Sequence, residues 1–318
     1  MAERSRLRLL YFGTPSFAVP ALRALAAGPH TLAGVVSQPD RPRGRGRALE
    51  PTPVGACARE LGLELLQPEK VGDDTALDWL RARRADLGVV VAFGQFIPKS
   101  VRELPPLGLI NAHASLLPRW RGAAPIERAL DAGDARTGIS VMRVAKEMDA
   151  GDVCLVRELA IGPAETAGEL AERLSALAAE ALVAGVDEIA AGRAQFRAQD
   201  PGGVTLAPKI ERDFARLDPS WSAERALRRL RAATPRPGID LRLRRSGKSL
   251  RVLRARVGAA HGGVTPGALR ADGEHLRLAC CDAWLELELI QLAGKRPLAA
   301  AEFLRGFRVP DAEEVESP

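Results

Sequence analysis

The fold and the candidate site both depend on residues 109–118, whose sequence is Leu109-Ile110-Asn111-Ala112-His113-Ala114-Ser115-Leu116-Leu117-Pro118. Residues 109–113 predict a buried strand that ends in polar residues. Side chains two apart in a strand point to the same face, so Asn111 and His113 should project side by side. An amide can stabilise a developing oxyanion, and an imidazole can move a proton near neutral pH. This pair of side chains is therefore typical of an acyl-transfer site.

A second short stretch, Met148-Asp149-Ala150-Gly151-Asp152, supplies a carboxylate in a glycine-bearing loop. From there Asp149 could orient His113 or tune its charge. The alternative is a histidine that is merely hydrogen-bonded at a strand end, which is the more common meaning of an arbitrary Asn-x-His pattern. The sequence around these residues decides between the two interpretations.

The flanking sequence predicts an open α/β sheet. Residues 7–12 form an apolar run that meets Gly13-Thr14-Pro15-Ser16 and then a helix, and a strand, tight turn and helix typically open such a sheet. Residues 87–92 are apolar throughout, as in a parallel strand buried on both faces. The first turn lacks the G-x-G-x-x-G pattern, so a dinucleotide cofactor is not indicated. We expect a Rossmann-like, mostly parallel sheet.

A family resemblance extends this interpretation. The run INAHASLLPRWRGAAPI at 110–126, followed by MDAGD at 148–152, closely resembles the folate-dependent formyltransferases. The likeness includes FGTP at 12–15, QPDRP at 38–42 and GKR at 294–296, and so covers nearly the whole chain. The resemblance implies transfer of a formyl group from 10-formyltetrahydrofolate to the free amino group of methionine on initiator methionyl-tRNA, which serves translation initiation. It implies no metal.

The same resemblance assigns roles to individual residues. Asn111 would donate to the oxygen that becomes negative, His113 would be the acid–base group, and Asp149 would orient His113. The folate contacts it implies are Ser115, Leu116, Leu117 and Pro118. Arg119 and Arg121 could face either the folate or the tRNA, and the sequence leaves this open.

Residues 38–47 predict an exposed, mobile and basic loop. Its prolines, glycines and alternate arginines are incompatible with a helix or an interior strand. A mobile segment with four guanidinium groups suits ordering on phosphate, although a surface excursion without function is the alternative. In the resembled family a loop at this place contacts the acceptor end of the tRNA. The residues that would do so here are Arg41, Arg43, Arg45 and Arg47.

The C-terminal part predicts a second domain. Five short alternating runs with glycine turns, at 239–243, 249–257, 267–270, 276–279 and 284–292, favour a small OB-like β-barrel. We therefore expect a catalytic domain over 1–200, a linker over 201–219, a tRNA-binding barrel domain over 220–310 and a disordered acidic tail over 311–318.

The charge distribution points to the same division. The net charge is +6, and residues 1–200 hold 25 basic and 25 acidic side chains, whereas residues 201–318 hold 21 and 15. Residues 225–256 contain twelve basic side chains and one acid, Asp240. Such a window predicts a polyanionic partner, here the tRNA, although a basic surface without a partner is the alternative.

Composition and termini indicate the compartment. No stretch approaches the roughly 18 apolar residues of a membrane span, and residues 1–6 do not resemble a signal peptide. The four cysteines lack zinc-site spacing, and a reducing environment fits them best. We expect a cytoplasmic monomer that binds no membrane and no metal.

Two other functions stay open. One is a related formyltransferase or hydrolase that acts on a small amine or on the formyl folate itself, which would need neither the arginine loop nor the basic barrel. The other is a tRNA-binding module whose α/β domain senses folate, which would leave the Asn111, His113 and Asp149 set without a task.

Overall fold

The computed structural model describes residues 6–43, 48–310 and 313–316. Contacts between residues divide the chain into two units. The N-terminal unit comprises Met1–Gly122, Arg136–Ala160 and Ala171–Ala207, and the C-terminal unit comprises Ala123–Ala135, Ile161–Leu170 and Pro208–Pro318. Two segments that precede residue 171 in the chain thus belong with the C-terminal unit. The continuous domain boundaries expected from the sequence remain a prediction.

The N-terminal unit is built on a seven-stranded sheet with the order β10-β9-β7-β6-β1-β2-β5. The strands β5, β2, β1, β6 and β7 are parallel, while β9 runs antiparallel to both β7 and β10. The predicted Rossmann-like, mostly parallel sheet is therefore confirmed. The strands are β1 (Arg8–Gly13), β2 (Thr31–Val36), β5 (Leu65–Leu66), β6 (Leu87–Val91), β7 (Leu109–His113), β9 (Arg136–Arg143) and β10 (Val153–Ala160).

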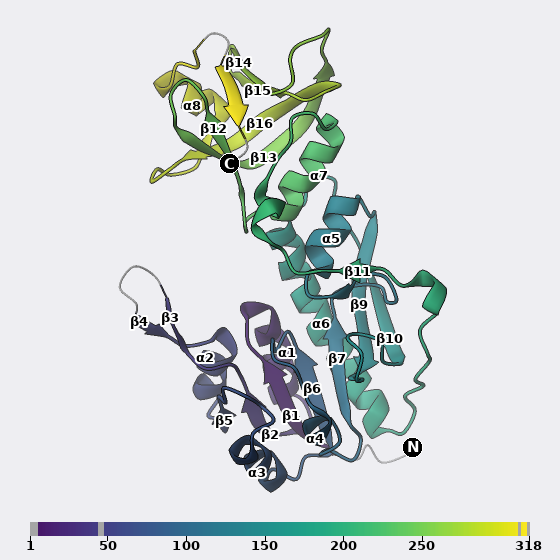
Figure 1. The fold of residues 1–318 in the computed structure, drawn as a ribbon. Helices are drawn as coiled ribbons and strands as arrows, with labels where there is room; N and C mark the ends of the chain where they lie inside the picture. The colour runs from purple at the N-terminus through teal and green to yellow at the C-terminus, as the bar shows by residue number, and fades with distance from the viewer. Residues whose placement is uncertain (1–5, 44–47, 311–312, 317–318) are drawn as a thin grey trace. The chain divides into compact units, whose positions relative to one another are not determined.

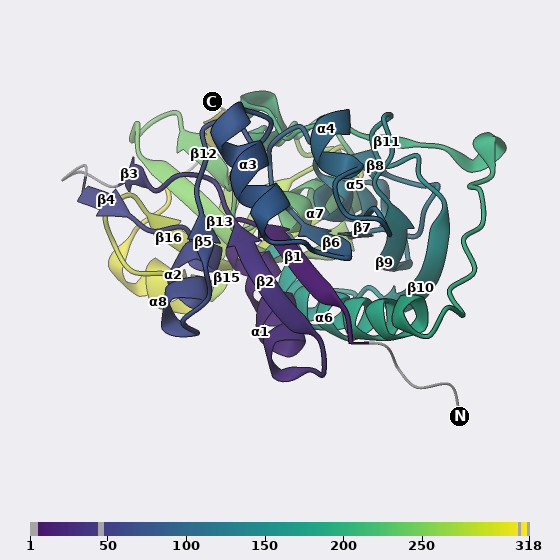
Figure 2. The same cartoon turned by 90° about the horizontal axis from the view of Figure 1, so that it is seen from below.

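Helices cover both faces of this sheet. Figure 2 shows α1 (Val19–Ala27) and the long α6 (Ala167–Ala190) along one face, and α3 (Asp74–Ala82) and α4 (Lys99–Arg102) along the other. A further helix, α2 (Pro53–Glu60), precedes β5. None of the helices within the described residues is long and apolar enough to cross a membrane.

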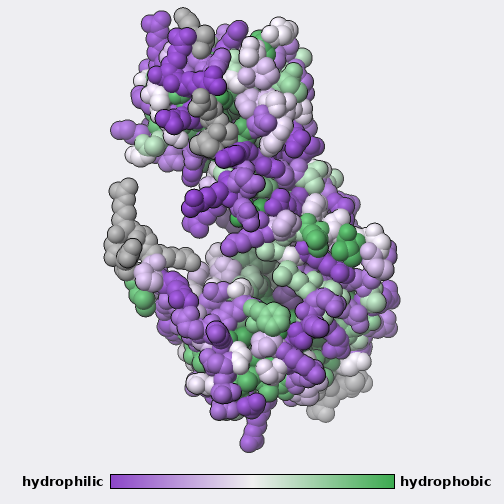
Figure 3. All heavy atoms as spheres, viewed as in Figure 1, coloured by the Kyte–Doolittle hydropathy of each residue, from purple (hydrophilic) through white to green (hydrophobic). Residues whose placement is uncertain are grey.

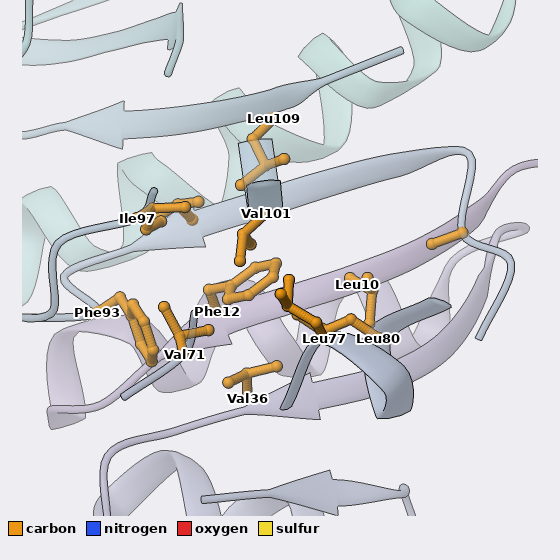
Figure 4. Packing of buried hydrophobic residues seen from close by; sticks show 12 residues of the cluster. Leu10, Phe12, Val36, Val71, Leu77, Leu80, Phe93, Ile97, Val101 and Leu109 are labelled. Carbon is orange, nitrogen blue, oxygen red and sulfur yellow. The ribbon is translucent and has the colours of Figure 1, made fainter. Parts of the chain in front are cut away.

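One part of the hydrophobic core lies between the sheet and the helices α3 and α4. Side chains of β1, α3 and α4 meet there, among them Phe12, Leu80 and Val101 (Figure 4). The Phe93 ring, just after β6, packs edge-on against Phe12 with ring centroids 5.6 Å apart. This packing holds the loop that follows β6 against the carboxyl end of β1, where open α/β sheets bind ligands.

The C-terminal unit contains a closed antiparallel barrel. Six strands follow the order β13-β12-β18-β14-β15-β16, and pairing of β13 with β16 closes the ring. The predicted small barrel is confirmed. Its strands are β12 (Ile239–Leu243), β13 (Ser249–Ala260), β14 (Ala268–Asp272), β15 (His275–Ala279), β16 (Ala283–Leu292) and β18 (Glu313–Glu316), with the short β17 (Leu298–Ala299) beside β16 (Figure 1).

Three helices accompany the barrel. They are α5 (Pro125–Ala132), α7 (Ala223–Ala233) and α8 (Ala300–Gly306). Helix α7 packs on β13 and β16 and also on α5, while α8 packs on β15 and β16. The side chain of Ser222 caps α7 by accepting from the Arg225 N–H at 3.3 Å.

The acidic tail differs from expectation. It was predicted to be disordered, but Glu313–Glu316 forms β18 between β12 and β14. Val315 is buried, and the Glu313 carboxylate accepts from the Arg245 N–H at 2.9 Å. The prediction of disorder is wrong for this strand, because ladder hydrogen bonds and one buried valine outweigh its acidic composition.

The basic loop is also more regular than expected. Arg41–Arg43 (β3) and Ala48–Glu50 (β4) pair as an antiparallel ribbon. The structure describes the chain of this hairpin only at β3 and β4, and Arg45 and Arg47 lie outside the described residues. The side chain of Asp40, just before β3, accepts the Thr52 N–H after β4 and so joins the two ends of the segment.

Candidate active site

Asn111 and His113 come from the same strand, β7, which lies between β6 and β9. Asn111 pairs with Val90 of β6 on one side and Met142 of β9 on the other. The two side chains are two residues apart and therefore share a face of the sheet. His113 is nearly buried, whereas Asn111 is partly exposed. In the parts of the chain that the structure describes, nothing hydrogen-bonds the Asn111 amide, which leaves its N–H groups available to a substrate.

Both ring nitrogens of His113 face an acceptor. Nε2 lies 2.8 Å from the Trp120 carbonyl oxygen, and Nδ1 lies 3.5 Å from Asp149 Oδ2. A carbonyl only accepts, so Nε2 carries a proton. A doubly protonated imidazole can donate to both acceptors, whereas a neutral imidazole has one N–H and can donate to only one of them. The 3.5 Å separation is longer than a standard hydrogen bond, so Asp149 acts here mainly through its charge.

The conformation of the 148–152 loop explains its sequence. Asp149 has a φ of 51°, in the left-handed region that aspartate tolerates better than most residues. Its Oδ2 accepts the Gly122 N–H at 2.8 Å. A Cβ at position 151 would lie 1.9 Å from the Arg143 carbonyl oxygen. Only glycine fits at position 151, where the backbone of the loop lies against Arg143, the last residue of β9.

Sequence reasoning missed one residue that holds this loop, Gln199. Its Nε2 donates to the carbonyl oxygens of Asp149 at 2.8 Å and Gly151 at 2.7 Å. Its Oε1 accepts from Arg121 Nε at 3.0 Å and Nη2 at 2.7 Å. Arg121 is therefore engaged within the protein, a possibility that the sequence did not raise. No local signal marked Gln199, which stands just before the predicted linker.

Hydrogen bonds of two buried serine hydroxyls stabilise the turn at 115–118. The Ser115 hydroxyl is fully buried and donates to the Arg119 carbonyl at 2.6 Å. The Ser140 hydroxyl donates to the Ser115 carbonyl at 2.8 Å and accepts the Leu117 N–H at 3.1 Å. Leu117 and Pro118 line a cavity of about 580 Å³ whose walls also include residues of β10 and of 193–200. The Ser115 side chain is thus internal, whereas Leu117 and Pro118 border open space.

Two loops near β7 carry exposed apolar side chains. Phe96, in the loop after β6, is 75% exposed, and Met148 is 71% exposed. Arg102 Nη1 joins the two loops by donating to the carbonyls of Ile97 at 3.4 Å and Ala145 at 3.2 Å. Large exposed apolar side chains beside polar groups mark ligand-binding surfaces.

The base of the arginine hairpin is a polar cluster around Asp40. The carboxylate accepts from the Thr52 N–H at 3.0 Å, Gln67 Nε2 at 2.6 Å and Arg59 Nη2 at 2.9 Å. Burial acts to raise the pKa of Asp40, but these donors together hold the pKa below its usual value. Arg41 forms an exposed ion pair with Glu69 at 2.6 Å. The side chain of Arg43, like Arg45 and Arg47, lies outside the described residues.

The basic window at 225–256 is partly neutralised. Five of its twelve basic residues pair with carboxylates: Arg229 with Asp131, Arg244 with Glu314, Arg251 with Asp240, Arg254 with Glu169, and Arg256 with Glu286 and Glu288. Exposed residues of the described chain in this window without a carboxylate partner include Arg236, Arg242, Arg245 and Lys248. The surface of the C-terminal unit is mostly hydrophilic in Figure 3.

The cysteines are poor candidates for a nucleophile. Burial raises the pKa of the thiols of Cys57 and Cys154, and it raises the pKa of Cys280 to about 12. These three thiols stay protonated near neutral pH. Within the described ranges, histidine, cysteine, aspartate and glutamate side chains form no cluster of three or more that could hold a metal ion.

An amide and an imidazole on β7, with a loop carboxylate beside the imidazole, lie on a Rossmann-like sheet that a small barrel follows, as in a transferase of one-carbon groups. The chain belongs to the formyl transferase family: the family model described as "Formyl transferase" matches residues 5–186, and "Formyl transferase, C-terminal domain" matches residues 209–308. It is 42% identical to the methionyl-tRNA formyltransferase of Bradyrhizobium sp. (strain BTAi1), over 95% of this chain and 97% of the relative. It is 44% identical to that of Pseudomonas paraeruginosa, over 95% of this chain and 96% of the relative.

Solved structures share the fold at low sequence identity. HypX from Aquifex aeolicus, crystallised in complex with tetrahydrofolic acid, has a TM-score of 0.62 and 17% identity over 97% of this chain and 51% of its own. WlaRD, a sugar 3N-formyl transferase, has a TM-score of 0.66 and 12% identity over 91% of this chain and 99% of its own. At these identities the likeness concerns the fold alone.

Proposed function

We propose that this protein transfers the formyl group of 10-formyltetrahydrofolate to the free amino group of methionine on initiator methionyl-tRNA. The observation that carries the proposal is the 42% identity to methionyl-tRNA formyltransferases along 95% of the chain, which includes both units. The proposal places the enzyme in the cytoplasm, where translation begins. Its monomeric state remains a prediction.

The reaction needs no covalent intermediate with the enzyme. The methionine nitrogen attacks the formyl carbon, and the formyl oxygen becomes negative in the tetrahedral intermediate. When this intermediate collapses, the bond between the carbon and folate N10 breaks, N10 takes a proton, and the methionine nitrogen loses one. Tetrahydrofolate and formylmethionyl-tRNA are the products.

Three side chains act on this sequence of steps. Asn111 donates to the oxygen as it becomes negative, for which its unengaged amide is suited. His113 moves the proton to the leaving nitrogen. Asp149 orients the His113 ring, which the Nδ1 to Oδ2 separation of 3.5 Å supports.

The folate sits against the loops around β7. Phe96 and Met148 offer apolar faces to its ring system. Leu116, Leu117 and Pro118 remain the proposed contacts of the turn. Ser115 also remains a proposed contact, and its buried hydroxyl, hydrogen-bonded to the Arg119 carbonyl, supports that turn from within.

Two basic surfaces receive the tRNA. The hairpin with Arg41, Arg43, Arg45 and Arg47 contacts the acceptor end. Arg242, Arg245 and Lys248, on and after β12, contact phosphates of the rest of the molecule, because their charges are exposed and lack carboxylate partners among the described residues.

A formyl transferase that acts on a small amine is the second candidate, because WlaRD, described as a sugar formyl transferase, shares the fold over 91% of this chain. The test supplies 10-formyltetrahydrofolate with four acceptors in turn: methionyl initiator tRNA, free methionine, a nucleotide-linked amino sugar, and water alone. We expect transfer to the tRNA only. Comparable transfer to the sugar or to free methionine would refute the proposed acceptor.

A further inference from the structure

A single strap of chain, residues 199–207, contacts the groups that hold both His113 and Asp149. Within this strap, β11 (Leu206–Ala207) pairs in parallel with β8 (Arg121–Gly122). The Thr205 hydroxyl accepts the Trp120 N–H at 2.9 Å, and the Thr205 carbonyl accepts the Arg121 N–H at 2.9 Å. The strap therefore orders the backbone between positions 120 and 122.

That backbone is what touches the proposed catalytic pair. The carbonyl of Trp120 accepts from His113 Nε2, and the N–H of Gly122 donates to Asp149 Oδ2. Gly122 has a φ of 124°, and a Cβ there would lie 2.6 Å from the Ala207 carbonyl oxygen. A side chain at position 122 would therefore collide with the strap.

Gln199 adds the second attachment, directly to the loop of Asp149. The Gln199 side chain makes four hydrogen bonds, all within the protein. It donates two to the carbonyls of Asp149 and Gly151 and accepts two from the Arg121 guanidinium. Without this amide, the two carbonyls and Arg121 are left without their partner. A left-handed residue such as Asp149 persists only where its surroundings hold it.

We propose that Gln199 is a positioning residue, which sets the orientation of Asp149 and through it that of His113. The inference rests on the proposed function. Its four hydrogen bonds all go to protein groups, so it acts by fixing the loop backbone on one side and Arg121 on the other. Misplacement of a catalytic group by about 1 Å can cost roughly 10²-fold in rate, which sets the size of the expected effect.

The experiment uses the full-length protein with the changes Gln199→Ala, Gln199→Glu and, as a control, Thr31→Ala. Glutamate keeps an oxygen for Arg121 but has no N–H for the two loop carbonyls. We expect both Gln199 variants to lose roughly 10- to 100-fold in kcat, with little change in KM for either substrate and with an altered pH profile of kcat. Thr31 is exposed at the start of β2 and lies outside the cavity that Gln199 lines, so Thr31→Ala should match the unchanged protein.

A double-substitution cycle separates positioning from general support. Because Gln199 acts through Asp149, Gln199→Ala should cost almost nothing further in an Asp149→Ala background. An equal loss in both backgrounds would overturn the proposal, as would a Gln199→Glu variant with unchanged kcat. Should Gln199→Ala fail to fold, Gln199→Glu in the same cycle decides the matter. A failure of the proposed function is distinguishable, because the unchanged protein would then not formylate the tRNA.

Discussion

At the scale of single residues, the side chain of Asn111 has the clearest task, since its amide is positioned beside His113 and bonded to nothing in the described chain. Asn111→Ala should slow formyl transfer by roughly 10²- to 10³-fold with folate affinity little changed, because an oxyanion donor acts mainly in the transition state. Single-turnover transfer and equilibrium folate binding measure the two quantities. A loss below tenfold would remove Asn111 from this role.

His113 and Asp149 should behave as one unit. Each alanine substitution should slow transfer at least as much as Asn111→Ala, yet the double variant should be little worse than either single one, because Asp149 acts through His113. Rates for the four proteins of the cycle test this expectation. Fully additive losses would show that the 3.5 Å pair in the structure does not act together in catalysis.

At the scale of elements, the start of α6 is stabilised by a capping box. Thr166 Oγ1 accepts the Glu169 N–H at 3.3 Å, and Glu169 Oε2 accepts the Thr166 N–H at 2.9 Å. Thr166→Ala should reduce the free energy of unfolding by about 1 kcal/mol. Urea unfolding at neutral pH measures the change, and Thr31→Ala, at an exposed strand end, is the control.

The same box should make stability depend on pH. The Thr166 N–H, then its hydroxyl, and Arg254 hold the pKa of Glu169 below its usual value, against a smaller effect of burial. A carboxyl group whose pKa is lower in the folded than in the unfolded protein stabilises the fold at pH values above its unfolded pKa, which is about 4.3 for glutamate. This stabilisation is lost as the pH falls through the pKa of the folded protein. Glu169→Gln should therefore cost a few tenths of a kcal/mol at pH 7, since the group is half exposed, and nothing near pH 2. A cost that persists at pH 2 would exclude this linkage.

The arginine hairpin is an element with little buried surface and a fixed base. Replacing Arg41, Arg43, Arg45 and Arg47 together should raise KM for the tRNA and weaken its salt dependence, while folate binding and thermal stability stay unchanged. Asp40→Asn leaves the arginines in place but weakens the base, so it should raise KM for the tRNA to a smaller extent. Collapse of the fold in the quadruple variant would mean that the hairpin is structural.

At the scale of the whole molecule, tRNA affinity should fall steeply with salt because binding to phosphates releases counterions. Replacing Arg242, Arg245 and Lys248 with glutamine should lower the slope of log affinity against log salt by about 0.7–0.9 for each phosphate that is no longer neutralised. The combined change Arg251→Gln and Asp240→Asn, which removes a neutral pair, should leave the slope unchanged. Equal slopes for the first variant and the unchanged protein would show that these residues do not meet phosphates.

Separating the two units should be difficult, contrary to what the sequence indicated for residues 1–200. Helix α5, from the first half of the chain, packs on α7 of the C-terminal unit, and its Ala129 and Leu130 are fully buried. A fragment that ends at Ala207 lacks α7 and exposes this apolar surface. We expect it to aggregate, as light scattering would show, whereas a monodisperse fragment would support the boundary expected from the sequence.

The sequence by itself determined the elements and the chemical trio. The apolar run predicted a strand at 109–113, with the bounds that β7 has. The spacing of Asn111 and His113 placed both on one face, because alternation in a strand is a local property of the chain. Asp149 was found through its motif and the family resemblance, and its loop geometry then accounted for Gly151.

Only the tertiary structure decided which distant groups hold that trio. Gln199 binds a loop about fifty residues earlier, Arg121 turns to Gln199, and β18 enters the barrel despite its acidic composition. The bonds of Gln199 to the loop and the pairing of β18 use backbone carbonyls and N–H groups, which nearly every residue carries and no side-chain pattern marks. Which groups become partners depends on how the strands are arranged in space. The loop of Asp149 is therefore held by the strap at 199–207, most of which the sequence predicted to be a linker.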